Sequence, residues 1–230
     1  MSEPMRIALV GATGLIGRSF IDLAARRGDV RLTAVSRREM PLPPGARMEM
    51  FVAEPAQWGE VFEAIRPEVL VCALGTTWRK SGRDEAAFRA VDHDLVVETA
   101  RAAHGHGVQR LIAVSSTGAD AKSKNFYLRV KGEAERDLAK VGFKRLDLLQ
   151  PGLLRGARDG DRRFVERAGI VLSPLTDLFL RGNARRYRPI SARTVAEAAL
   201  ALALRRAAGR FKHDNDAILR AARGLAVPES

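Results

Sequence analysis

The feature that most constrains the fold is an alternation of short apolar runs with segments of helical periodicity. Such runs are too short for core helices, and strands buried on both faces of a sheet typically have this pattern. Strands that alternate with helices predict right-handed crossovers and a parallel sheet. We therefore expect an α/β fold with a Rossmann-like, doubly wound parallel sheet. The expected strands are 6–10, 30–35, 48–52, 69–74, 110–114 and 145–149, and the expected helices include 18–27, 57–65, 84–103, 194–205 and 216–223.

The composition is that of an ordinary soluble globular protein, with 46% apolar and 29% charged residues. The single cysteine, Cys72, rules out an internal disulfide framework and lies in an apolar run, so we interpret it as a buried thiol. The first residues contain no apolar signal core, and no apolar run is long enough to span a membrane. From these observations we expect a cytoplasmic protein.

The net charge of +12 raises the possibility of nucleic-acid binding. The basic residues are, however, spread along the chain and often stand beside acidic ones, and the aromatic fraction is only 6%. No basic run is interleaved with aromatic residues. We therefore expect an arginine-rich, solvated surface and no nucleic-acid partner.

A glycine-rich turn joins the first expected strand to the first expected helix. Gly11, Gly14 and Gly17 are spaced as GxxGxxG between the strand 6–10 and the helix 18–27. In this context Gly11 permits a tight turn, Gly14 lets backbone N–H groups approach a pyrophosphate, and Gly17 lets the helix lie close to the strand. The turn therefore predicts a dinucleotide site, although glycine also marks ordinary turns.

Other residues suited to ligand binding also follow expected strands. Arg37 and Arg38 come after the second strand, where arginine favours the 2′-phosphate of NADP(H) and a carboxylate would favour NAD. Gly75, Thr76 and Thr77 follow the fourth strand. Because ligands of open parallel sheets bind at the carboxyl ends of the strands, these residues predict a single site.

A tyrosine and a lysine follow the fifth strand at helical spacing. Tyr127 and Lys131 are four residues apart, which places both on one face of a helix. An ammonium beside a phenol favours the phenolate and so lowers the tyrosine pKa towards a value useful for proton transfer. Ser116, at the end of the fifth strand, is the preferred candidate for binding a substrate oxygen, and Ser115 and Thr117 remain alternatives. Together these groups predict a hydride-transfer site; an exposed pair on an amphipathic helix is the structural alternative.

On these motifs the chain resembles an atypical, single-domain short-chain dehydrogenase/reductase, and is most similar to the oxidoreductases related to the human HIV Tat-interactive protein. The glycine turn and the YxxxK motif are shared by the whole superfamily, whereas Leu-Gly-Thr-Thr and Ser-Ser-x-Gly-Ala-Asp are narrower. The matching segments, which span nearly the whole chain, are 11–14 with Gly17, 36–38, 74–77, 91–92, 115–120, 127–133 and 151–154.

The resemblance implies an NADP(H)-dependent oxidoreductase that acts on a carbonyl or alcohol substrate, with Tyr127 as proton donor or acceptor. It also implies that Arg162 corresponds to a cofactor-contacting arginine. We keep one alternative from another class, a redox sensor or scaffold that binds NADPH without turnover. With the glycine-turn and strand-end residues above, the expected cofactor-binding set is Gly11, Thr13, Gly14, Leu15, Ile16, Gly17, Arg37, Arg38, Leu74, Gly75, Thr76, Tyr127, Lys131 and Leu154.

We expect the whole chain, 1–230, to form one NAD(P)-binding domain, because a second full domain would be crowded at this length. Residues 153–230 would cover the substrate side of the sheet. Within them, the apolar stretch 170–180 suits a lid, with a subunit contact or a membrane-surface segment as alternatives. We expect no metal site.

Overall fold

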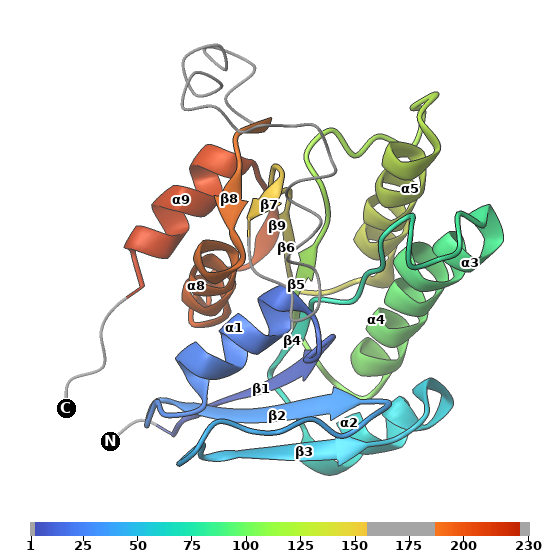
Figure 1. The fold of residues 1–230 in the computed structure, drawn as a ribbon. Coiled ribbons are helices and arrows are strands. Elements are labelled where there is room, and N and C mark those ends of the chain that lie inside the picture. The colour runs from blue at the N-terminus through green and yellow to red at the C-terminus, as the bar shows by residue number, and fades with distance from the viewer. Residues whose placement is uncertain (1–2, 156–186, 226–230) are drawn as a thin grey trace.

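A computed structural model describes residues 3–155 and 187–225 of the chain. A sheet of seven strands, all parallel, forms the centre, in the order β3-β2-β1-β4-β5-β6-β9 (Figure 1). The order reverses at β1, which lies between β2 and β4. The strands are β1 (Met5–Val10), β2 (Val30–Ser36), β3 (Met48–Val52), β4 (Val69–Cys72), β5 (Arg110–Val114), β6 (Arg145–Leu149) and β9 (Gly209–His213).

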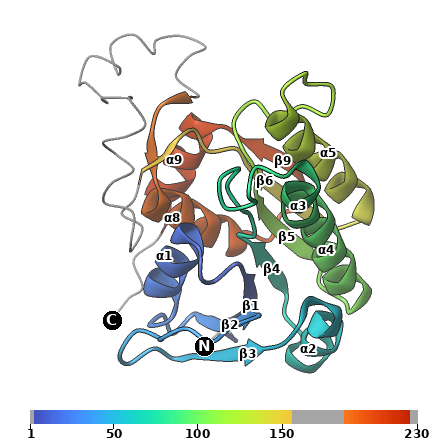
Figure 2. The same cartoon turned by 45° about the vertical axis from the view of Figure 1, so that its right-hand side comes forward.

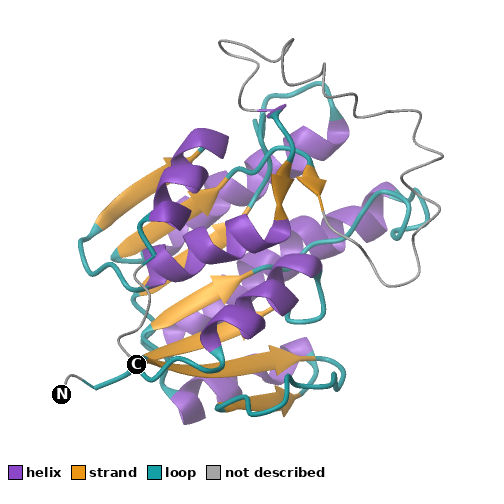
Figure 3. Ribbon diagram, turned by 60° about the vertical axis from the view of Figure 1, so that its left-hand side comes forward, coloured by secondary structure: helices purple, strands orange, loops and turns teal. Residues whose placement is uncertain are grey.

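Helices cover both faces of this sheet, as the views in Figures 2 and 3 show. One face carries α1 (Leu15–Ala24), α8 (Ala192–Ala203) and α9 (Asn215–Arg223), and the other carries α2 (Trp58–Ile65), α4 (Val96–Gly105) and α5 (Phe126–Val141). The remaining elements are the short helices η1 (Pro55–Gln57) and α3 (Glu85–Arg89), the π-helical segment η2 (Ala90–Leu95), and the two-residue strands β7 (Leu154–Arg155) and β8 (Ile190–Ser191). The predicted Rossmann-like, doubly wound fold is confirmed.

The core has two halves because each buried strand presents side chains to both faces. Ile7 and Leu9 of β1 pack with Phe20 of α1 and with α8, whereas Ala8 and Val10 pack on the side of α2 and α4. This explains why β1 is apolar throughout and does not alternate. Cys72 is buried in the second half, as expected.

Two features differ from the sequence prediction. The expected helix 84–103 is present as three successive pieces, α3, η2 and α4, because the backbone widens to a π-helix between Ala90 and Leu95. The strand β9 was not predicted, because Gly209–His213 contains a single apolar residue, Phe211, and pairs with β6 through backbone hydrogen bonds. Arg162 and the stretch 170–180 lie outside the described residues.

In the described ranges 3–155 and 187–225, the helices are all too short or too polar to cross a membrane.

Candidate active site

A cleft of about 310 Å³ lies at the carboxyl ends of β1, β4 and β5, where the strand order reverses. This is the crevice in which open α/β sheets bind ligands. Residues predicted from distant parts of the sequence meet here. Of the fourteen residues expected to bind the cofactor, ten line the cleft: Thr13, Gly14, Leu15, Ile16, Leu74, Gly75, Thr76, Tyr127, Lys131 and Leu154.

A larger and more open hollow, of about 590 Å³, lies near the amino ends of β1, β4 and β5. Its lining includes Arg6, Glu68 and Arg110, and Glu68 forms ion pairs with both arginines, at 3.8 and 3.3 Å. Because these charges compensate one another and none of the described helices begins at this edge of the sheet, we locate the site at the carboxyl edge.

The three glycines of the turn have different physical roles. Gly11 has φ +83°, and a Cβ there would lie 2.4 Å from the carbonyl carbon and oxygen of Ala73 in the neighbouring strand connection. A Cβ on Gly17 would lie 2.2 Å from Gly11 O. Both positions are therefore restricted to glycine by protein packing. Gly14 has its nearest obstruction, Gly11 O, at 3.3 Å and lines the cleft, so its missing side chain opens the turn towards a ligand.

The N-terminus of α1 faces the cleft and is suited to binding an anion. Gly14 occupies the N-cap and provides no side chain to accept the first N–H groups of the helix. Leu15 and Ile16, in the first turn, line the cleft. In contrast, the N-caps of α3, α5, α8 and α9 each accept a backbone N–H through a side chain. An uncapped helix N-terminus at a glycine turn suits the pyrophosphate of a dinucleotide.

Lys131 forms a buried ion pair with Asp92, which the sequence analysis did not assign to the site. The Lys131 Nζ lies 2.7 Å from Asp92 Oδ1, and the two side chains are 8% and 1% exposed. Burial lowers the pKa of Lys131, but the Asp92 carboxylate, with smaller contributions from Tyr127 and Cys72, outweighs this effect, so that the pKa lies above its usual value. Asp92 Oδ2 also accepts the backbone N–H of Thr76 at 2.8 Å. One carboxylate thus joins Lys131 to the turn after β4.

The position of Asp92 depends on the π-helical segment η2 and on a glycine opposite it. A Cβ on Gly75 would lie 3.3 Å from Asp92 Oδ1 and 3.8 Å from Lys131 Nζ, so a larger residue would crowd the pair. The spacing of a regular helix does not reveal a π-helical turn, although such turns are frequent at functional sites. The one signal in the sequence was the segment 91–92 of the family resemblance.

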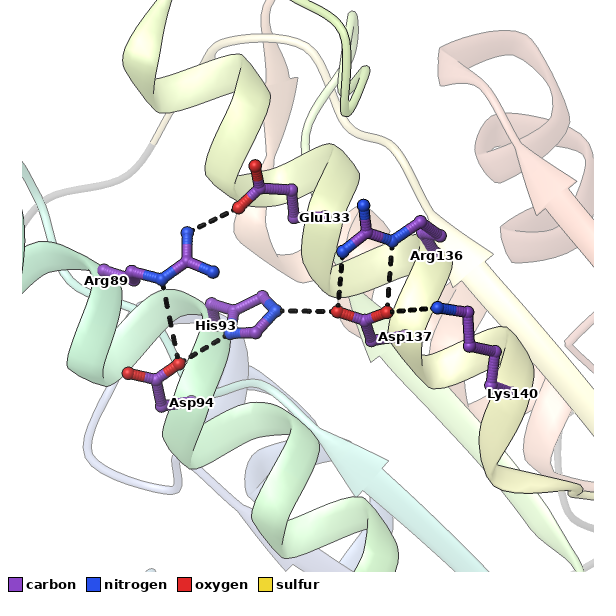
Figure 4. Close-up of polar contacts among 7 residues, drawn as sticks. All are labelled: Arg89, His93, Asp94, Glu133, Arg136, Asp137 and Lys140. Carbon is purple, nitrogen blue, oxygen red and sulfur yellow. Dashed lines mark hydrogen bonds and ion pairs between the residues drawn. The ribbon is translucent and has the colours of Figure 1, made fainter.

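A polar network joins η2 to α5 (Figure 4). The two ring nitrogens of His93 contact Asp94 Oδ1 at 2.6 Å and Asp137 Oδ2 at 3.1 Å. Arg136 and Lys140 also contact the Asp137 carboxylate. The network therefore holds the two helices together and so supports the contact between Asp92 and Lys131.

Tyr127 lies in the first turn of α5, one turn before Lys131 on the same side of the helix. Asn125 caps this helix by accepting the N–H of Leu128 at 3.1 Å. Tyr127 is 37% exposed, and both it and Lys131 line the cleft. The structure therefore brings the predicted pair to the same cleft as the glycine turn.

The serines after β5 are arranged differently from the prediction. Ser115 lines the cleft, and its hydroxyl donates to Glu135 Oε1 at 2.5 Å. Ser116 is not among the lining residues, and its hydroxyl makes a 3.4 Å contact with Thr117 O. Thr117 donates to Gln150 O at 2.7 Å.

Arg37 and Arg38 are exposed just beyond the carboxyl end of β2, next to β1. The backbone N–H of Arg38 donates to Ser36 Oγ at 3.3 Å. The two arginines thus lie at the same edge of the sheet as the cleft but do not line it.

Comparison with known proteins places this geometry in a family. Residues 11–205 match a family described as NAD(P)H-binding. The chain is 34% identical over 185 residues to "Protein fmp52, mitochondrial" of Aspergillus clavatus, covering 74% of this chain and 79% of that protein. It is also 34% identical over 158 residues to "Protein FMP52, mitochondrial" of Saccharomyces cerevisiae, covering 67% and 68%.

Solved structures share the fold. MoeE5 in complex with UDP-glucose and NAD superposes with a TM-score of 0.66 at 15% identity, over 90% of this chain and 75% of that chain. A putative NAD-dependent epimerase/dehydratase from Bacillus halodurans gives 0.66 at 23% identity, over 96% and 100%. At these identities the likeness concerns the fold alone.

The expected cytoplasmic location is contradicted by these relatives, whose names place them in mitochondria. That expectation used the missing apolar signal core, which separates secreted proteins from others. Mitochondrial targeting segments are instead amphipathic and arginine-rich, so the observation could not distinguish the two compartments.

Three findings support the same assignment to a family: the family match, the coverage of the FMP52 proteins, and the parallel sheet with its glycine turn. The chain belongs to the NAD(P)H-binding family and has a Rossmann-like fold, which it shares with MoeE5.

Proposed function

We propose that the protein is an NADP(H)-dependent oxidoreductase that transfers a hydride to or from a carbonyl or alcohol substrate. One observation supports this above all: Tyr127 and Lys131, one helical turn apart, line the same cleft as the uncapped N-terminus of α1. A proton-transfer group and a pyrophosphate cradle are the two parts that such a reaction requires of the protein. The resemblance to the Tat-interactive-protein-like oxidoreductases supports the same reaction.

The cofactor-binding roles follow from the lining of the cleft. The N–H groups of Leu15 and Ile16 would bind the pyrophosphate, and Gly14 would leave room for it. Leu74, Gly75 and Thr76 would border the cofactor on the side of β4, and Leu154 on the side of β6. When bound, NADPH supplies the hydride.

The remaining roles belong to side chains at the substrate. Tyr127 would give a proton to the substrate oxygen or take one from it, and the Lys131 ammonium would stabilise the phenolate electrostatically. A serine after β5 would bind the substrate oxygen. The sequence favours Ser116 for this role, whereas the lining of the cleft favours Ser115.

We also propose a preference for NADP(H) over NAD(H). Arg37 and Arg38 follow β2 at the edge where the adenosine ribose binds in this fold, and arginine there favours the 2′-phosphate. Both side chains are exposed, so neither is committed to the core.

One observation favours the alternative, an NADPH-binding sensor without turnover. The Lys131 ammonium is 2.7 Å from Asp92, and the Ser115 hydroxyl donates to the buried carboxylate of Glu135. Two groups with proposed roles at the substrate therefore already have internal partners. A sensor would bind the cofactor in the same cleft and leave carbonyl compounds unchanged.

Calorimetric titration with NADPH and NADH, followed by turnover on a panel of aldehydes and ketones, distinguishes these functions. We expect NADPH to bind more tightly, and Tyr127→Phe to retain binding but lose turnover by at least about 100-fold. An Arg37→Ala, Arg38→Ala double variant should lose the preference for NADPH. Absence of NADPH binding would refute both functions. Binding without turnover, unaffected by Tyr127→Phe, would favour the sensor.

A further inference from the structure

Four aromatic rings from three elements form a continuous cluster that includes Tyr127. Trp78 lies in the loop between β4 and α3, Phe88 lies in α3, and Phe126 and Tyr127 begin α5, which stands beside α3 (Figure 1). The ring centroids of Phe88 and Tyr127 are 5.5 Å apart, and those of Trp78 lie 5.7 Å from Phe126 and 6.3 Å from Phe88. These are tilted and edge-on contacts, which aromatic pairs prefer.

The burial of these rings is uneven. Phe88 is completely buried, whereas Trp78 is 39% exposed and Tyr127 37% exposed. The other tryptophan of the chain, Trp58, is 2% exposed. Phe88 thus anchors the cluster to the core. Tryptophan is highly buried on average, so the open surface of Trp78 indicates more than core packing.

Trp78 does not itself line the cleft, but residues close to it in the chain do. Thr77 and Lys80, on either side of Trp78 along the chain, line the cleft together with Tyr127. Ring contacts thus connect Tyr127, in the cleft, through the buried Phe88 to the exposed Trp78. A ligand whose oxygen reaches Tyr127 would have the rest of its surface beside these rings.

We propose that Trp78 is a substrate-binding residue and that the substrate is an aryl ketone or aldehyde, or the matching aryl alcohol, whose ring packs against the indole. This inference rests on the proposed oxidoreductase function. In reduction, the carbonyl carbon gains a hydride from NADPH, which is oxidised to NADP⁺, and the oxygen gains a proton from Tyr127, which solvent replaces. The product is the alcohol. An aromatic pair adds enough binding free energy to change affinity by up to about tenfold.

Tryptophan fluorescence tests the binding step without turnover. With NADP⁺ bound, the Trp58→Phe variant reports Trp78, and Trp78→Phe reports the buried Trp58 and corrects for light absorbed by the ligand. We expect acetophenone to quench Trp78 saturably, and cyclohexyl methyl ketone, its saturated analogue, to bind about tenfold more weakly. Equal, unsaturable quenching of both variants would overturn the proposal.

Steady-state kinetics test the role in selectivity. Trp78→Ala should raise KM for acetophenone about tenfold, with kcat within threefold and little change for the saturated ketone. Phe51→Ala is the matched control, because Phe51 is 38% exposed on β3 at the sheet edge. Equal losses for both ketones would mean that Trp78 is only structural. If NADPH does not bind, the proposed oxidoreductase function is wrong. If NADPH binds and both ketones turn over equally well, only the proposed role of Trp78 in binding an aryl substrate is wrong.

Discussion

Replacing Asp92 by asparagine tests whether the buried ion pair with Lys131 holds the site together. The substitution keeps the shape of the side chain and leaves an oxygen able to accept the N–H of Thr76. It removes the negative charge 2.7 Å from the Lys131 ammonium, in a place where both side chains are less than a tenth exposed. Lys131 is then a buried charge without compensation.

The expected loss of unfolding free energy is about 3 kcal/mol, the lower end of the range for breaking a buried pair. In a chain of this size, such a loss lowers Tm by roughly 6–12 °C. Replacing the whole pair, as Asp92→Asn with Lys131→Met, should restore stability to within about 1 kcal/mol of the wild type, because no buried charge remains. The two single substitutions should therefore be strongly non-additive.

Urea unfolding at several pH values measures these differences. In the wild type the pKa of Lys131 is raised, so the contribution of the pair is complete at pH 7 and persists until the pH exceeds the ordinary lysine value. In Asp92→Asn we expect burial, the largest single influence on this pKa, to outweigh the remaining contributions of Tyr127 and Cys72, so that the folded-state pKa falls below the unfolded one. The unfolded state then binds more protons, so the stability of this variant should rise with pH.

The deficit of Asp92→Asn relative to the wild type should therefore shrink between pH 7 and about pH 9.5. A deficit that does not change with pH, or a double variant as unstable as the sum of the single ones, would refute the electrostatic explanation.

Three further outcomes follow from the packing and charges of the fold. Gly17→Ala should destabilise the chain by about 1–3 kcal/mol, because its Cβ would lie 2.2 Å from a backbone oxygen, whereas Gly28→Ala, with nothing within 4 Å, should change stability by less than about 0.5 kcal/mol; thermal unfolding compares them. Cys72, whose pKa burial raises to about 11, should react with a thiol reagent at pH 8 only after denaturant is added; rapid reaction of the folded protein would contradict its burial. The Arg136 guanidinium holds the pKa of Asp137 below its usual range, so Asp137→Asn should be less stable by about 1 kcal/mol from pH 8 to pH 5, and the difference should shrink below about pH 4; a constant difference down to pH 3 in unfolding curves would contradict the ion pair.

Strand positions were predictable where burial alone decides the residue types. The predicted runs 110–114 and 145–149 coincide with the buried strands β5 and β6. The run 48–52 also coincides with β3, although none of its residues is buried, because its residue types still favour a strand. β9 could not be found in this way, because an edge strand of Gly, Arg, Phe, Lys and His has no apolar run. Its pairing with β6 depends on backbone groups that every sequence possesses.

The site was predictable to the extent that it lies at strand ends. The glycine turn and the Tyr127–Lys131 pair follow regular elements, so local spacing located them. Asp92 depends on a π-helical turn, and its contact with Lys131 spans 39 positions of the chain, which no local pattern reveals. The exposure of Trp78 could be interpreted only from the fold, because the aromatic cluster combines residues from three separate elements.

The basic residues of β9 affect how two copies of the protein interact in solution. As the last strand of the sheet, it has a row of backbone groups on its outer side that could pair with another chain. If two copies paired antiparallel about Phe211, Arg210 of one would stand opposite Lys212 of the other. Like charges at directly opposed positions destabilise such a pair. The basic residues of β9 therefore oppose edge-to-edge self-association and the aggregation to which it leads.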